Sequence, residues 1–455
     1  MKHHARLFLA LLALSLVGCD KKSDEPGPVQ PPQSETQQLL EQLAKKVVTL
    51  NTVEPSGPTT DLDALSPFLR DKQIIGVGEA SHGSSEFYKM RHRLFRYGVA
   101  HWGFKVLAVE MPFGTGAYLD DYIRTGQGNL PQLLKDSQYW VYTTQEFAAL
   151  VEWMKSYNVG KTEAERLKIY GFDAQPQGAV TSVNWLRTYF TRSAPAYVAA
   201  FNQATASISE GYPEFNGLTQ EQILAALPRI SRQYQDRINE VIAYLTANRA
   251  ALTAQSGDAT YRLALQHAQV LLQGMTQLGF ADEDAGSEYR DEYMAQNVKW
   301  ISEYENNGKV MALAHNGHIL KGLSPGAKKK NLKWLGYHLN NLYGNRYYSL
   351  GFIFNEGGFR ASTPNGVQSF TVKPFPGGFT ESLSTMKKPL FFMDIASVSQ
   401  NAALRSALDN TYFFYNIGAV YANGIPDSSA GAGYNLAQLY DGVIYVDKAT
   451  PTTGL

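Results

Sequence analysis

The sequence predicts an α/β fold, with a mainly parallel central sheet flanked by helices and an inserted all-helical subdomain that acts as a lid. Short runs rich in apolar and β-branched residues recur along the chain, separated by segments with apolar residues at helical spacing. These runs are continuously apolar rather than alternating, which is typical of parallel strands covered on both faces. Aromatic residues make up 12% of the chain and charged residues 18%, which indicates a globular body.

The first eighteen residues resemble a secretory signal. Lys2 and Arg6 precede an apolar run from Leu7 to Val17, which is too short to span a bilayer as an ordinary helix. The run ends in Leu16-Val17-Gly18-Cys19, which resembles a bacterial lipobox, in which the cysteine carries the lipid. We therefore expect an exported protein that loses residues 1–18 and is anchored to a membrane of the bacterial cell envelope through lipid on Cys19. An uncleaved anchor helix is the alternative.

Residues 19–36 predict a flexible tether, because they are polar, charged and proline-containing, with almost nothing apolar. The folded domain is expected over residues 37–455. Its core alone must stabilise it, since Cys19 is the only cysteine and disulfides, thiolate metal sites and a cysteine nucleophile are thereby excluded. Loss of two of the 41 basic residues with the signal leaves 39 against 41 acidic ones, a net charge near −2. That charge excludes a nucleic-acid binder working through bulk positive charge.

The chain order of elements follows from the periodicity. A helix is predicted from about Leu39 to Leu50, and another over Glu86–Trp102, where apolar residues recur at helical spacing. Residues 193–285 carry helical spacing and no strand-like run, so we expect them to form the inserted subdomain. The predicted strands are Gln73–Glu79, Lys105–Glu110, Leu167–Phe172, Lys309–Ala314, Tyr347–Phe354, Leu390–Ile395 and Gly442–Val446.

Acidic residues and histidines gather at the carboxyl ends of four predicted strands. In chain order these ends carry Glu79-Ala80-Ser81-His82-Gly83, Glu110, Asp173 and His315-Asn316-Gly317-His318. In open α/β sheets, ligands bind in the crevice outside such ends. Two of the nine histidines lie in the signal, and three of the other seven fall in these windows. We therefore expect one functional site at this edge of the sheet.

The residue types at this edge suit hydrolysis. A histidine can take a proton from water near neutral pH, and a carboxylate can fix its tautomer and stabilise the imidazolium. Glu79 and Glu110 are placed for that role, with strand-end salt bridges as the structural alternative. Arg91 and Arg290 would add positive charge to the site, although an exposed surface position suits either arginine equally well.

Other hypotheses use some of the same residues. Glu79-x-x-His82 and His315-x-x-His318 offer ligands that Zn²⁺ or Mn²⁺ would accept, although no HExxH pair stands on one helix face. Gly322–Gly326 matches the GxSxG pattern of serine hydrolases, but Pro325 has no N–H to donate to an oxyanion hole, so this segment is interpreted as a loop. Ser81 is better placed but lacks a nucleophile elbow, which favours a hydrogen-bonding or turn role.

Five segments resemble the erythromycin esterase family. They occur in the family's order and at comparable spacing, and they cover the core from about residue 73 to 355. Ser81 stands where the family usually has threonine, a departure that keeps the hydroxyl. The segments are Gly78–Leu94 (GEASHGSSEFYKMRHRL), Leu107–Phe113 (LAVEMPF), Tyr170–Gln175 (YGFDAQ), Arg290–Asn297 (RDEYMAQN) and Ala312–Ile319 (ALAHNGHI).

The resemblance implies a deep cleft between an α/β core and a helical subdomain. It also implies that water opens the macrolactone ester of 14-membered macrolides, without a serine nucleophile, a metal or another cofactor. The family's essential histidine falls on His82, the expected general base. Asp173 and Ser81 are expected to support the substrate. The family's two glutamates fall on Glu79 and Glu110, and its two arginines fall on Arg91 and Arg290. Its HNxH histidines fall on His315 and His318.

The leading hypothesis is therefore a lipid-anchored hydrolase of a small-molecule ester or lactone, with a macrolide as one candidate substrate. His315 and His318 are candidates for polarising the carbonyl or protonating the leaving alkoxide. The envelope location departs from the family's cytoplasmic resistance enzymes, so another lactone or an envelope ester stays open as the substrate. Two alternatives are a metal-dependent hydrolase and a non-catalytic envelope lipoprotein that binds a glycan or hydrophobic ligand, with sugars stacked on Tyr139, Trp140 and Tyr142.

Overall fold

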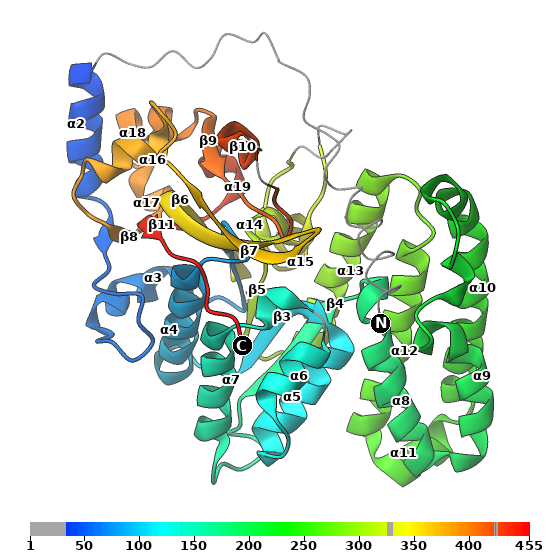
Figure 1. The fold of residues 1–455 in the computed structure, drawn as a ribbon. Helices are drawn as coiled ribbons and strands as arrows, with labels where there is room; N and C mark the ends of the chain where they lie inside the picture. The colour runs from blue at the N-terminus through cyan, green and yellow to red at the C-terminus, as the bar shows by residue number, and fades with distance from the viewer. Residues whose placement is uncertain (1–32, 138, 325–330, 423, 425) are drawn as a thin grey trace.

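The computed structural model describes residues 33–455 except 138, 325–330, 423 and 425 (Figure 1). In this part of the chain, nine strands form one sheet, which confirms the predicted α/β class. The strand order is β1 (Val48–Thr49), β8 (Leu390–Asp394), β11 (Gly442–Ala449), β6 (Tyr347–Thr363), β2 (Ile74–Val77), β5 (Val310–Leu313), β3 (Val106–Pro112) and β4 (Lys168–Asp173), with β7 (Gly366–Val372) paired to β6.

The sheet is mainly parallel. From β11 through β6, β2, β5 and β3 to β4, every neighbouring pair runs parallel. Strands β8, β1 and β7 pair antiparallel to their neighbours. A small second sheet joins β9 (Tyr412–Tyr415) to β10 (Gly431–Tyr434), also antiparallel. All seven predicted strands are present, and the carboxyl ends of β2, β5, β3 and β4 meet at one edge.

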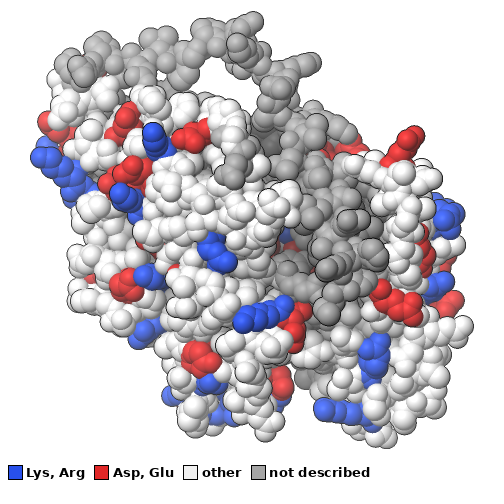
Figure 2. All heavy atoms as spheres, in the orientation of Figure 1, with Lys and Arg blue, Asp and Glu red and all other residues white. Residues whose placement is uncertain are grey.

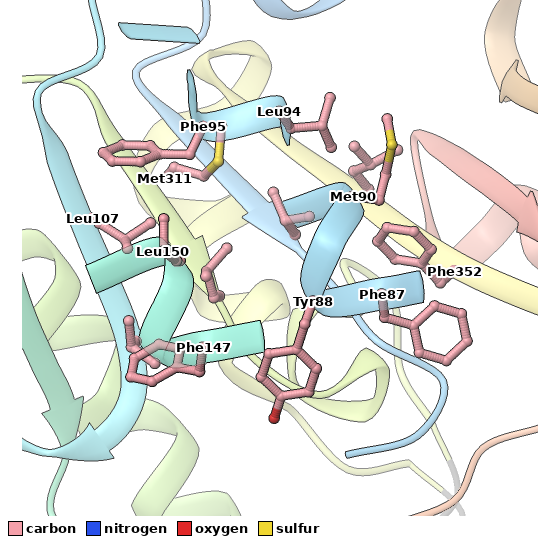
Figure 3. Close-up of a cluster of buried hydrophobic side chains, with 14 of the residues drawn as sticks. Phe87, Tyr88, Met90, Leu94, Phe95, Leu107, Phe147, Leu150, Met311 and Phe352 are labelled. Atoms are coloured by element: carbon pink, nitrogen blue, oxygen red, sulfur yellow. The ribbon is translucent and has the colours of Figure 1, made fainter. Parts of the chain in front are cut away.

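The sheet separates two apolar cores, because successive side chains of a strand point to opposite faces. Ile75 and Leu107 pack into one core, whereas Ile74 and Val106 pack into the other. Figure 3 shows the first core, where aromatic and aliphatic side chains of two helices meet those of the sheet. The helices are α4 (Ser85–His101) and α7 (Gln145–Asn158) on the first face, and α13 (Glu283–Tyr304) and α15 (Leu335–Tyr343) on the second.

The segment between β4 and β5 contains helices and no strand among its residues, all of which are described. Five of its helices enclose a third apolar core and lie to one side of the sheet in Figure 1. This core begins at Ala179 and ends at Leu278, so the prediction of residues 193–285 placed its start one helix too late. Motion of this insertion as a lid stays a prediction. The helices are α8 (Ala179–Ser193), α9 (Val198–Ser209), α10 (Gln220–Ala247), α11 (Arg249–Ser256) and α12 (Asp258–Gln277).

The amino-terminal predictions fall partly outside the described residues. The signal over residues 1–18, the lipidated Cys19 and the tether as far as residue 32 lie there. Helix α2 (Gln33–Ala44) begins inside the predicted tether, because one further turn precedes the buried Leu40 and Leu43. The helix predicted to Leu50 ends at Ala44, since the β-branched residues that follow pair with β8 as β1.

Charges are mixed on the surface. Figure 2 shows acidic and basic side chains interspersed over the face presented, so neither sign dominates it. None of the helices in the described part of the chain combines the length and apolarity that a membrane crossing requires.

Candidate active site

The predicted site residues come from six segments that meet at the carboxyl edge of the sheet. The loop between β2 and α4 holds one glutamate and one histidine of the site. The loop after β5 leads into α14 (Asn316–Ile319), where the other two histidines lie. These residues are Glu79, Ser81 and His82 after β2, Arg91 in α4, Glu110 in β3, Asp173 at the end of β4, Arg290 in α13, and His315 and His318 around α14.

A buried carboxylate orients His82. Its Nδ1 lies 2.7 Å from Oε1 of Glu79, and because a carboxylate only accepts, Nδ1 carries the proton. Nε2 makes no hydrogen bond within the described residues, so its lone pair is available to a proton. The His82 side chain is 11% exposed, against 1% for Glu79. The imidazole therefore stands at the accessible side of the pair.

Arg91 pairs with the oxygen of Glu79 that does not contact His82. Its guanidinium pairs with Oε2 of Glu79, and its Nε donates to the carbonyl oxygen of Gly78 at 2.8 Å. Two further carbonyls, those of Val77 and Ala314, accept from the same side chain. Arg91 is 1% exposed, so the surface alternative is wrong for this residue. Its contacts fix the carboxylate that orients His82.

Arg290 joins two of the predicted acids. Its Nε and Nη2 lie 3.0 and 2.7 Å from the two oxygens of Asp173, a bidentate pair, and Nη2 is also 2.8 Å from Oε1 of Glu110. Burial would lower the pKa of Arg290, but Asp173 and Glu110 raise it well above its ordinary value. Arg290 of α13 is thus a fixed positive charge between the ends of β3 and β4.

His318 is a cation held between two acids. Its Nδ1 lies 2.7 Å from Oδ1 of Asp291, and its Nε2 lies 3.2 Å from Oε1 of Glu110. Burial opposes the charge, yet Asp291 and Glu110 raise the pKa of His318 to about 10. With this pKa the ring is an imidazolium at neutral pH, and its Nδ1 donates to Asp291. Its Nε2 faces Glu110 and also lies 3.2 Å from Nη1 of Arg290, a cation that lowers the pKa of His318. Asp291 lies within the RDEYMAQN segment, where no motif or spacing predicted a role for it.

Glu110 is the charged link between these groups. Burial would raise its pKa, but His318, Arg290 and His82 hold the pKa of this carboxyl well below its usual range. Its second oxygen, Oε2, accepts the backbone N–H of His315 at 2.9 Å. One carboxylate therefore faces the Arg290 guanidinium, the His318 imidazolium and the loop after β5.

His315 has no free ring nitrogen. Its Nε2 lies 3.1 Å from the carbonyl oxygen of Ile417 and so donates, while its Nδ1 accepts the N–H of Gly317 at 3.3 Å. Burial and the neighbouring His82 lower the pKa of His315 well below its ordinary value. The neutral ring lies 4.8 Å from the ring of His82, centroid to centroid, so the two imidazoles pack against each other.

The loop that carries His82 is closed by residues distant in the sequence. The backbone N–H of Thr452 donates to the carbonyl of Gly83 at 2.8 Å, and that of Ser85 donates to the carbonyl of Thr450, also at 2.8 Å. Ser81 is fully buried, and its Oγ accepts the N–H of Gly83 at 3.0 Å. This contact is the turn role predicted for Ser81, and it directs the hydroxyl into the loop.

The remaining candidates have structural surroundings. Tyr142 is buried and donates its hydroxyl to the carbonyl of Glu110 at 2.8 Å, whereas Trp140 is half-buried. Ser324 forms an isolated bridge with Leu332, and Pro325 and Gly326 of the GxSxG match lie outside the described residues. Within the described part of the chain, no group of three or more His, Cys, Asp or Glu side chains is arranged to hold a metal ion.

Known proteins share this sequence pattern and fold. A family model described as erythromycin esterase matches residues 99–449. Erythromycin esterase type II of Escherichia coli is 25% identical over 340 residues, which cover 71% of this chain and 79% of that protein. A solved succinoglycan biosynthesis protein has a TM-score of 0.77 at 24% identity, covering 93% of this chain and 100% of its own. A solved erythromycin esterase mutant in an open conformation has a TM-score of 0.66 at 16% identity, covering 90% and 98%.

Proposed function

The chain belongs to the erythromycin esterase family, and from that premise we propose that it is a carboxylic-ester or lactone hydrolase in which His82 activates water. The observation that carries the proposal is the ordered set of Arg91, Glu79 and His82. A buried carboxylate holds one ring nitrogen, and the other ring nitrogen stays free at the accessible side. Such a ring is prepared to accept a proton without first reorienting.

The first step is the attack of water on the ester carbonyl. Nε2 of His82 takes one proton as the water oxygen bonds to the carbonyl carbon, and the carbonyl π electrons move onto its oxygen. The imidazolium that forms is stabilised by Glu79 at 2.7 Å. General-base assistance of this kind contributes roughly 10²–10⁴-fold in rate. Ser81, whose hydroxyl is occupied in the loop, takes no part in bond formation.

The second step expels the alcohol. The tetrahedral oxyanion re-forms the carbonyl, the bond to the alkoxide oxygen breaks, and a proton returns to that oxygen. His82 in its imidazolium form and His318 are the available donors, and Arg290 adds positive charge on the same side as His318. Loss of one preorganised donor of this kind costs roughly 10²–10³ in kcat. The net reaction adds one water across the ester.

The proposal extends to location and substrate. The protein acts in the cell envelope, held there by lipid on Cys19, on a small-molecule ester or lactone. A macrolide is one candidate. The similarity to a succinoglycan biosynthesis protein keeps acylated glycans among the others.

The decisive experiment measures hydrolysis by the chain from residue 33 onward. The wild type, His82→Ala and His101→Ala are incubated with erythromycin, other lactones and acetylated sugars, and mass spectrometry detects the gain of one water. His101 is exposed at the end of α4 and serves as the matched control. We expect turnover by the wild type and the control, and a loss of about 10²–10⁴-fold in His82→Ala.

A parallel series contains EDTA. Hydrolysis that is insensitive to the chelator supports the water-activating histidine. Loss in EDTA with recovery on added Zn²⁺ or Mn²⁺ would favour the metal-dependent alternative, in which the same side chains are ligands. A His82→Ala protein that keeps most of its activity contradicts the general-base role.

A further inference from the structure

A small pocket lies beside the loop that carries His82. It has a volume of about 240 Å³, below the roughly 300–1,000 Å³ of sites that enclose a whole drug-sized ligand. It therefore suits one chemical group of a ligand. Its walls come from helix α6 (Leu130–Asp136) and the turn after it, from β6, and from residues 454–455. The lining residues are Lys135, Trp140, Thr143, Arg360, Gly454 and Leu455.

Two cations and no acidic side chain line this pocket. Across the described residues, neither Arg360 nor Lys135 has an acidic side chain within ion-pair distance, whereas Arg91 and Arg290 are both paired. Nη1 of Arg360 is buried and makes no hydrogen bond. A buried donor without an acceptor costs about 1–3 kcal/mol, and more when charged. An oxyanion in the pocket would offset the positive charge that Arg360 carries without an acidic partner.

The position of Arg360 is fixed by its backbone. Its N–H donates to the carbonyl oxygen of Gly83 at 3.0 Å. Its guanidinium lies against Gly454, where an added Cβ would come within 3.0 Å of Nη2. The absence of a side chain at Gly454 thus permits this approach. A guanidinium held in one place presents a planar fork that matches a carboxylate or phosphate.

The same pocket shares partners with the His82 loop. Gly83, the acceptor for Arg360, directly follows His82. On the other wall, the hydroxyl of Tyr88 lies 2.6 Å from the carbonyl oxygen of Val141 and 3.2 Å from that of His82. Val141 follows Trp140, which lines the pocket. Hydrogen bonds to the backbone therefore join both walls of the pocket to the loop that carries His82.

We propose that this pocket binds the oxyanion of an acidic, sugar-sized ligand, through Arg360 and Lys135, with Trp140 offering apolar surface to the ring. Carboxylate and phosphate share this chemistry, and both pair with a guanidinium fork. The inference deepens the proposed function and rests on it in one respect. If the chain is an esterase, its favoured substrates are esters or lactones that carry a negative charge at a distance from the ester.

Binding is tested apart from catalysis. The full chain carrying His82→Ala, purified in detergent, is titrated calorimetrically with glucuronate, glucose 6-phosphate and uncharged glucose. We expect both anions to bind and glucose not to bind. Arg360→Gln and Lys135→Gln each weaken anion binding at least tenfold. Arg249→Gln changes an exposed arginine on α11 and leaves the affinity unaltered.

Two results overturn the pocket. One is equal affinity for glucose and the anions, and the other is unchanged anion binding in Lys135→Gln. Thermal melting checks that Arg360→Gln is folded, and Lys135→Gln decides the case if it is not, because Lys135 is exposed at the end of α6.

Activity separates this inference from the proposed function. The His82-containing chain is assayed with the 4-nitrophenyl monoester of succinate and with its uncharged methyl-capped analogue. Arg360→Gln is expected to raise KM about tenfold for the acidic ester and to leave the neutral ester unchanged. Anion binding without hydrolysis of any ester would reject the esterase and keep the pocket. Hydrolysis of both esters at similar rates, without binding of the anions, would reject the anion-binding role of the pocket and keep the esterase proposal.

Discussion

Two histidines three positions apart in the sequence carry different charges, and their partners are the cause. His315 is buried with a carbonyl and an N–H as its ring partners, so it stays neutral. His318 meets two carboxylates, which raise its pKa to about 10 despite burial. The motif thus supplies one neutral ring that packs against His82 and one cation. Surroundings rather than residue type assign the two roles.

Asp291 sets the charge of His318 in this scheme. Replacing it by asparagine removes the first carboxylate that raises the pKa of His318, so that pKa should fall. The imidazolium then loses its proton at lower pH, and the alkaline limb of the pH–rate profile should move to lower pH. The profile of kcat against pH checks this. Glu292→Gln, an exposed neighbour, should leave the limb in place. An unmoved limb in Asp291→Asn would falsify the role of His318 as the acid.

The same groups make stability depend on pH. The folded-state pKa of His318 is about 10, above its ordinary 6.5, so its contribution is complete below about pH 6.5 and is lost as pH rises through 10. Glu110 has a depressed pKa and acts in the opposite sense, losing its contribution as pH falls below about 4.3. We expect the free energy of unfolding to decline between pH 6.5 and 10. Denaturant titrations of His318→Asn should show a flatter decline, and an identical slope contradicts the prediction.

Four site residues could be predicted from the sequence, because parallel strands bring their carboxyl ends to one edge of the sheet: Glu79, His82, Glu110 and Asp173. Whether Arg91 faced the site or the solvent could not be predicted. That choice depends on which side of α4 packs against the sheet. The Ile417 carbonyl that occupies His315 lies about a hundred residues further along, where spacing gives no information.

At the scale of elements, helix α5 (Phe113–Thr125) lies against β4 at very close range. A Cβ added to Gly116 would stand 1.9 Å from the backbone nitrogen of Gly171. Alanine favours a helix interior by about 1 kcal/mol over glycine, but a clash with backbone outweighs that gain. Gly116→Ala should therefore lower the unfolding midpoint strongly, as calorimetry would show. Gly98→Ala in α4 is the control, because its nearest contact is an ordinary 3.4 Å, and it should be neutral or stabilising. A stable Gly116→Ala protein would show that α5 can shift.

Apolar runs located the strands but not their directions. Strand β8 is as continuously buried as β5, yet it pairs antiparallel at the edge of the parallel set. Strand β7 was not predicted, since it is an exposed hairpin partner of β6 with few apolar residues. Strand β1 has two residues, too few for any periodicity. The sequence shows which strands are buried on both faces of the sheet. It does not show which strand pairs with which, because the partners come from distant segments of the chain.

At the scale of the whole molecule, the helical insertion has an apolar core separate from the two cores of the sheet. Such units commonly open as one cooperative element. We expect hydrogen exchange followed by mass spectrometry to show α9, α10 and α11 opening together, at lower free energy than β2, β3 and β5. The prediction is contradicted if the insertion and the central strands exchange with the same free energy of opening and the same dependence on denaturant.

The closure of the His82 loop by Thr450 and Thr452 has a consequence for protein synthesis. A ribosome makes residue 82 long before it makes residue 450, at about 5–20 residues per second. For that interval the loop lacks the two backbone partners that hold it in shape. An unfinished chain, even one that has formed much of its sheet, therefore carries His82 on a loop that is not yet held in place. Under the proposed function, hydrolytic competence is therefore acquired only after residues 450–452 have been made.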